Sequence, residues 1–160
     1  MKVHRIFISP GHNYWGRDAV GPDNHPLVEV DQIECLAHHG LRGDRFCDYK
    51  SDYEGQVTFF SQDVFDDLCL DLGLNDKSPG AMRRNVIVSD IDLNSLIGKD
   101  FCLQDIHFRG MSHCAPCGWM DVALAPGAYA QLKKVRGGGL RAQILSDGVL
   151  RSGAARLTLA

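Results

Sequence analysis

The sequence predicts a mostly β fold, a barrel or sandwich of short strands with a few short helices. Six short segments are rich in Val, Ile, Phe and Leu, as β-strands are: residues 3–9, 56–60, 85–89, 106–109, 141–145 and 155–159. Turn-forming dipeptides separate them, among them Pro10-Gly11, Pro79-Gly80 and Asp147-Gly148. The regular alternation of strands with long helices that marks repeated βαβ units is missing. We therefore expect a barrel or a sandwich.

Helix signals occur in three places. Ser61 can cap a helix that Gly73 ends, and the apolar stripe of this helix consists of Val64, Phe65, Leu68 and Leu72. A second helix is expected from residue 126 to residue 136, because basic residues favour its C-terminal end and three glycines follow it. Residues 31–39, which precede a glycine, predict a third and shorter helix.

Composition narrows the class of protein. The 160 residues suit one domain, expected over residues 1–160, and can bury a core without disulfides. A net charge of -3 gives no electrostatic case for nucleic acid or an anionic membrane as a partner. No run of about 20 apolar residues predicts a membrane span, and the first residues are too mixed for a signal peptide. We expect a cytoplasmic protein whose six cysteines are reduced.

The segment richest in chemistry is residues 110–119, which contains Cys114 and Cys117. Two thiols three residues apart can ligate one metal, form a disulfide, or supply a nucleophile and its resolving partner. Two structural thiols paired by chance are the plain alternative. His113 precedes the first thiol and could lower its pKa or accept its proton, although a histidine beside a cysteine is more often incidental.

Two familiar dithiol sites fit this segment less well. A structural zinc site needs four ligands, and the chain offers one cysteine pair with His107 or His113 and no second pair at finger spacing. A thioredoxin centre needs the motif at the end of a buried strand in a βαβ unit. Residues 108–113 are instead a polar, glycine-containing exit from a strand, which argues against that fold.

Basic and glycine-rich segments could supply an anion site. Residues 40–45 and 82–85 carry arginines, whose guanidinium groups suit phosphate or carboxylate. The amides of residues 136–141, with three successive glycines, could cradle an oxyanion, and no P-loop continuation follows them. Each segment alone is explained as well by a solvated turn, a basic strand flank or a helix C-cap.

Taken in order, these segments resemble the MOSC domain, the C-terminal domain of molybdenum cofactor sulfurases that also occurs as a small stand-alone protein. The resemblance is carried by residues 40–46, 56–58, 84–88, 96–98, 114–117, 138–142 and 147–150. It spans nearly the whole chain, and its specificity lies in the ordered set because each motif alone is weak. Ala154 departs from the family pattern, which usually has an aspartate there.

The resemblance implies a MOSC-type β-barrel with a cysteine at the mouth of a ligand groove. In members that act on N-hydroxylated compounds, this cysteine ligates the metal of the molybdenum cofactor (molybdopterin); other members have been proposed to carry sulfur as a persulfide. We align Cys117 with this cysteine, and Cys114 is then a neighbouring or resolving thiol. The expected cofactor-binding residues are Arg42, Asp44, Arg45, Arg84, Asn85, Gly138 and Arg141.

The resemblance also implies a protein partner. The chain carries no iron–sulfur, flavin or pyridoxal-phosphate signature. A reductase of this kind needs a separate electron-transfer protein, and a sulfur carrier needs a separate cysteine desulfurase. The expected ligand is a small-molecule cofactor or substrate.

Overall fold

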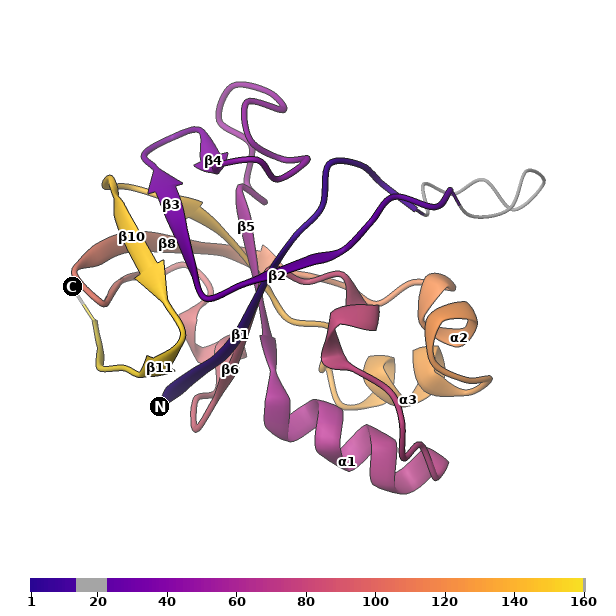
Figure 1. Ribbon diagram of the computed structural model, residues 1–160. Coiled ribbons are helices and arrows are strands. Elements are labelled where there is room, and N and C mark those ends of the chain that lie inside the picture. Colours follow the sequence, from indigo (N-terminus) through magenta and orange to yellow (C-terminus); the bar gives the residue numbers. More distant parts are fainter. Residues whose placement is uncertain (14–22, 160) are drawn as a thin grey trace.

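Figure 1 shows a computed structural model of the chain, which describes residues 1–13 and 23–159, and strands dominate it, as predicted. The strands are β1 (Lys2–Ile8), β2 (Val28–Val30), β3 (Gln32–Leu36), β4 (Gly40–Leu41), β5 (Val57–Ser61), β6 (Val86–Ser89), β7 (Asp100–Leu103), β8 (Ile106–His113), β9 (Leu140–Ile144), β10 (Gly148–Arg151), β11 (Gly153–Ala154) and β12 (Leu157–Leu159). The helices are α1 (Gln62–Leu72), α2 (Trp119–Ala123) and α3 (Ala128–Lys134), with short 3-10 turns η1 (Pro79–Met82) and η2 (Leu93–Leu96).

Two sheets organise the strands. The larger has the order β11-β1-β6-β5-β9-β8-β7-β12, with β2 paired to β1, and the smaller has the order β10-β3-β4. The β5–β6 pair is parallel, and the other strand pairs among the described residues are antiparallel. No pairing within residues 1–13 and 23–159 joins β11 to β12, so the expected barrel closure is not confirmed.

The central strands are buried on both faces. Every residue of β5 and of β6 is buried, and their side chains alternate between two apolar clusters. Phe59 packs in the cluster shared with the small sheet, whereas Phe60 packs in the cluster beneath the helices. In Figure 1 the three helices lie on one side of the large sheet, and β3, β4 and β10 lie on the other. Burial on both faces explains why these strands read as continuous apolar runs.

The two longer helices agree with the sequence signals. The Ser61 hydroxyl accepts a hydrogen bond from the amide of Val64 at the start of α1, and Gly73 ends the helix in the left-handed conformation. Helix α3 lies inside the predicted segment 126–136. Helix α2, directly after the second cysteine, was not predicted. None of the helices in the described ranges is long and apolar enough to cross a membrane.

The helix predicted at residues 31–39 is wrong. This segment contains β3, which pairs with β10 and β4. Ile33 and Cys35 are buried, whereas Gln32 and Glu34 are exposed. The period of two is that of a strand with one face on the core, and it outweighed the weak helix-ending signal of the following glycine.

Candidate functional site

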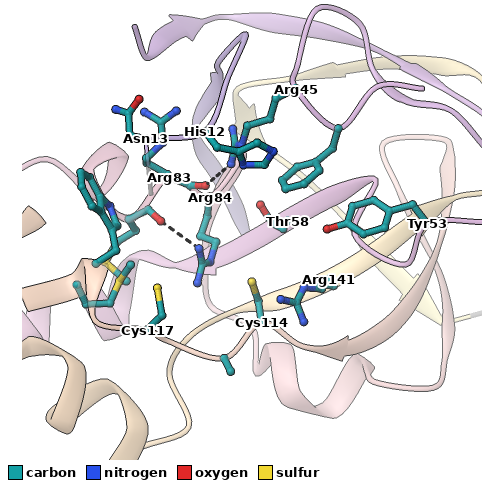
Figure 2. Close-up of a pocket in the computed structure, with 15 residues that line it drawn as sticks. His12, Asn13, Arg45, Tyr53, Thr58, Arg83, Arg84, Cys114, Cys117 and Arg141 are labelled. Atoms are coloured by element: carbon teal, nitrogen blue, oxygen red, sulfur yellow. Dashed lines mark hydrogen bonds between the residues drawn. The ribbon is translucent and has the colours of Figure 1, made fainter. Parts of the chain in front are cut away.

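A pocket of about 270 Å³ forms where loops from distant parts of the chain meet at one end of the large sheet (Figure 2). The loop after β1, the loop before β5, the entrance to β6 and the loop after β8 all contribute to it. Its described lining residues are His12, Asn13, Arg45, Phe46, Tyr53, Thr58, Met82, Arg83, Arg84, Cys114, Ala115, Cys117, Trp119, Met120 and Arg141. The lining therefore contains four arginines and two thiols, and none of these residues is acidic.

The two cysteines line this pocket at different depths. Cys114 is 5% exposed, whereas Cys117 is solvent-exposed. Strand β8 ends at the preceding His113, and the amide of Cys114 donates to the carbonyl of Gly139 at 2.8 Å. The carbonyl of Cys117 accepts the amide of Met120 at 3.0 Å, so the second thiol stands at the start of α2. Figure 2 shows both sulfurs on the pocket side of the loop.

The surroundings of the pair differ from a zinc site and from a thioredoxin site. Within the described ranges, no three His, Cys, Asp or Glu side chains are grouped so that they could hold a metal ion. The pair does precede a helix, as in thioredoxin. However, β8 is antiparallel to both β7 and β9, so the parallel βαβ context is missing here.

Arg45 is a deeply buried cation in the pocket wall. Its side chain is 8% exposed, and its guanidinium contacts the Asp44 carboxylate at 3.2 Å and the carbonyl of Arg83 at 3.0 Å. Its Nε has no hydrogen-bond partner in the part of the chain that the structure describes. Burial lowers the pKa of Arg45, which the Asp44 carboxylate partly offsets. One donor of this guanidinium therefore has unmet hydrogen-bonding capacity.

Arg83 and Arg84 come from the turn that enters β6. Arg83 ends η1 with a φ of 53° and donates to the Ser9 hydroxyl at 2.6 Å and to the carbonyl of Gly11 at 2.7 Å. Burial lowers its pKa to about 10. The Arg84 guanidinium donates to the carbonyls of Gly138 and Met82, at 3.0 and 3.2 Å. Because these partners are neutral, neither arginine has a carboxylate partner among the described residues.

Arg141 and Tyr53 form the wall opposite the second thiol. Arg141 on β9 lies 3.8 Å from the Glu54 carboxylate, a loose ion pair that leaves its charge partly available. Figure 2 shows the Tyr53 hydroxyl pointing towards Thr58 and the pocket interior. Burial raises the pKa of Tyr53, so its hydroxyl stays protonated and can donate.

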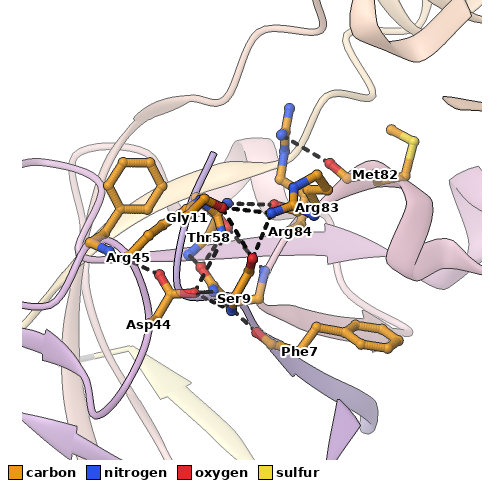
Figure 3. Close-up of polar contacts among 11 residues, drawn as sticks. Phe7, Ser9, Gly11, Asp44, Arg45, Thr58, Met82, Arg83 and Arg84 are labelled. Carbon is orange, nitrogen blue, oxygen red and sulfur yellow. Dashed lines mark hydrogen bonds and ion pairs between the residues drawn. The ribbon is translucent and has the colours of Figure 1, made fainter. Parts of the chain in front are cut away.

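Asp44 and Asn85 were predicted to bind the cofactor, but neither lines the pocket. Figure 3 shows Asp44 among its polar contacts with Arg45 and the loop after β1. The Asp44 carboxylate accepts from the amides of Ser9 and Phe46 and from the Asn85 side chain, each at 3.1 Å. The Asn85 amide also bonds to Thr58 and to the carbonyl of Phe7. Both residues are nearly fully buried, so their hydrogen bonds hold loops together and do not face a ligand.

Gly138, a further predicted binding residue, also acts from behind the lining. A Cβ atom on it would lie 2.2 Å from the carbonyl oxygen of Cys114 and 2.7 Å from the Pro116 ring. Glycine is therefore required for the close approach of the two loops. Its amide donates to His113 Nε2 at 3.2 Å, and its carbonyl accepts from Arg84.

Arg42 was predicted to bind the cofactor and lies outside the pocket. Its guanidinium forms an ion pair with Glu34 at 2.5 Å, on the exposed side of the small sheet. Arg42 and Arg45 belong to the same tight loop but point to different sides, and the sequence does not say which one faces inward. Arg45, Arg84 and Arg141 line the same pocket as Cys114 and Cys117.

Sequence reasoning missed several lining residues: His12, Asn13, Tyr53, Thr58, Arg83 and Trp119. Arg83 stands in the basic run that was noted, and its position at the end of a Pro-Gly turn was an available signal. His12 lies after the first strand, and burial lowers its pKa to about 4, with the Arg45 charge acting in the same direction. The histidine is therefore neutral at pH 7.

Comparison with known proteins gives one family match and several similar solved structures. A family model described as the MOSC domain matches residues 36–155. The YuaD protein from Bacillus subtilis has 15% identity and a TM-score of 0.73, over 98% of this chain and 93% of that chain. YiiM from Geobacillus stearothermophilus has 11% identity and a TM-score of 0.69, over 99% and 74%. YiiM from Escherichia coli has 17% identity and a TM-score of 0.63, over 98% and 69%. The search of curated proteins found no match.

At these identities the solved structures establish a shared fold, and the family model establishes the family. The matched residues include β5, β6, β8 and the cysteine loop (residues 114–118), which contribute most of the pocket lining; His12 and Asn13 lie outside the match. The resemblance inferred from the ordered motifs is confirmed, and this chain belongs to the MOSC domain family.

Proposed function

We propose that this protein binds the molybdenum cofactor through the Cys117 thiolate and reduces N-hydroxylated compounds with electrons from a separate protein. The observation that carries the proposal is an exposed thiol at the rim of a pocket lined by four arginines. Membership of the MOSC family supports it. A thiolate is a soft ligand suited to a thiophilic metal, and guanidinium groups suit an anionic cofactor.

The residues present fit such a ligand. Arg45, Arg84 and Arg141 would hold its phosphate and the edge of its pterin, and Arg83 adds a fourth charge to the same lining. Arg42 has no part in this set because it lies on another surface. When bound, the cofactor would supply the metal centre that exchanges electrons with a substrate.

The chain's own side chains would bind and orient. Arg84 is held by two carbonyl groups, so its guanidinium is aligned before a ligand arrives. Asp44 and Asn85 fix the loops that carry Arg45 and Thr58. The Tyr53 hydroxyl can donate a hydrogen bond to a substrate oxygen.

The test is metal and pterin content after expression in a host that makes the cofactor. We expect stoichiometric molybdenum and pterin in the wild-type protein and in Cys102→Ser, whose thiol lies on β7 away from the pocket. We expect loss of both in Cys117→Ser. A well-folded protein from such a host that holds no molybdenum would overturn the proposal. Purified holoprotein should then reduce N-hydroxylated compounds when given an electron source.

The second candidate is a sulfur carrier with a persulfide on the same cysteine. The exposure of Cys117 favours it, because a cysteine desulfurase must reach the thiol directly. Intact-mass analysis after incubation with a desulfurase and cysteine should show one extra sulfur atom, which a reductant removes. Cys117→Ser should stay unmodified. Persulfide formation without molybdenum binding would favour this function over the reductase.

A further inference from the structure

A hydrogen bond behind the pocket wall fixes the protonation state of a histidine. The amide of Gly138 donates to His113 Nε2 at 3.2 Å. A backbone N–H has no lone pair to offer, so this ring nitrogen must be unprotonated and must act as the acceptor. The bond exists only while His113 is neutral.

The same glycine positions a pocket arginine. The Gly138 carbonyl accepts from Arg84 Nε at 3.0 Å, so the peptide groups around this residue link the His113 ring to the Arg84 guanidinium. The glycine is also packed against the carbonyl of Cys114 and against Pro116, which leaves it little room to shift without moving the cysteine loop. Arg84 lines the pocket with both thiols, whereas His113 does not line it.

Three positive charges act on His113. Arg136 lies beside the three glycines 137–139 (the glycine loop), Arg84 lies at the entrance to β6, and Arg141 lies on β9. Each of the three charges opposes the protonation of His113. The Arg136 carbonyl acts in the opposite direction. Burial is the largest effect, and the pKa of His113 is lowered overall. The ring is therefore neutral at pH 7.

We propose that neutral His113 is a positioning residue for Arg84: it holds the Gly138 peptide so that the guanidinium faces the anion-binding pocket. Protonation places an N–H against the Gly138 N–H, breaks the bond and frees the glycine loop. The inference rests on the proposed function only in taking the pocket to bind an anion. It assigns His113 a role different from that of activating the neighbouring thiol.

We expect the anion affinity to change with pH in the direction opposite to that expected from net charge alone. Lower pH makes a protein more positive, so an anion should bind more tightly if charge alone decided. Loss of an aligned Arg84 should instead weaken binding by about tenfold as His113 becomes protonated, since a hydrogen bond to a charged group contributes about 1.5 kcal/mol or more. Sulfate is the suitable probe, because its charge is constant across this range of pH.

The experiment measures sulfate affinity by calorimetry between pH 8 and pH 4.5, together with the NMR signal of the Arg84 Nε–H. His113→Asn and His113→Gln keep a side-chain acceptor that does not titrate. These variants should therefore keep at low pH the sulfate affinity that the wild type loses. His113→Ala should bind weakly at every pH. His107→Asn, an exposed change on the same strand, should behave as the wild type.

The Arg84 signal reports on the bond without any ligand. In the wild type it should broaden or shift as the His113 ring titrates, and in His113→Asn it should stay constant. Sulfate binding that tightens with falling pH, or an Arg84 signal unaffected by His113 titration, would overturn the proposal. Neither measurement uses molybdenum. A negative result for His113 can therefore be told apart from a protein that binds no molybdenum. The NMR measurement tests the His113 proposal even if sulfate does not bind.

Discussion

The pocket has one thiol at its base, Cys114, and one at its rim, Cys117, and the two thiols lie in different surroundings. At the base, Cys114 is buried, and its backbone is tied to the glycine loop that also holds Arg84. At the rim, Cys117 is exposed at the start of a five-residue helix. The base is held by buried polar contacts, whereas the thiol at the rim faces solvent. We therefore expect Cys117 to be the more reactive of two thiols that are three residues apart.

The largest effect is expected for Asp44→Ala. Its carboxylate is buried with four partners, and its removal leaves the Arg45 charge buried without a counter-ion. We expect a loss of about 3–5 kcal/mol in the free energy of unfolding, measured with urea. Asp48→Ala, which removes an exposed partner of His39, should cost less than about 1 kcal/mol. Equal costs would mean that the base is not organised by this carboxylate.

Gly138→Ala should be the next most damaging change. Its Cβ would meet the carbonyl of Cys114 at 2.2 Å, and backbone on both sides must move. We expect a loss of about 3 kcal/mol in urea unfolding. Gly73→Ala, with a φ of 64° and open space around the new atom, should cost about 1 kcal/mol from backbone strain alone. A Gly138→Ala protein as stable as Gly73→Ala would show that the base tolerates movement.

Alkylation rates compare the two thiols directly. Under native, reducing conditions Cys117 should react with iodoacetamide at least about tenfold faster than Cys114, because the reagent reaches the exposed sulfur without local opening. Peptide mapping of a time course measures both rates in one sample. In urea the two rates should converge. Equal native labelling, or faster labelling of Cys114, would move the key ligand to the base.

The smallest effect is the pH dependence that His12 contributes. Burial lowers its pKa to about 4, below the ordinary value of about 6.5. The unfolded chain therefore takes up this proton first, and stability should fall as pH decreases from about 6.5 to about 4. His12→Asn should flatten part of that slope, and NMR should give a titration midpoint near 4. A midpoint near 6.5 would place His12 in a more solvated setting.

Local signals sufficed where a few neighbouring residues decide the structure. Ser61 and Gly73 mark the ends of α1 because a cap is made within one turn of the helix. The apolar runs of β5 and β6 predicted strands, and the ordered motifs predicted the MOSC family. By contrast, the alternation of residues 32–36 was read as a helix, because a short segment carries few periods to count.

What the sequence determined by itself was the mostly β composition, the family and the pairing of two thiols with basic loops. The tertiary structure alone decided which side of each loop faces the pocket. It turned Arg42 outward to Glu34, placed Asp44 and Asn85 behind the wall, and brought Tyr53 into the pocket lining. The physical reason is distance along the chain. His113 and Gly138 are 25 residues apart, and the bond between them exists only after β8 and β9 have paired.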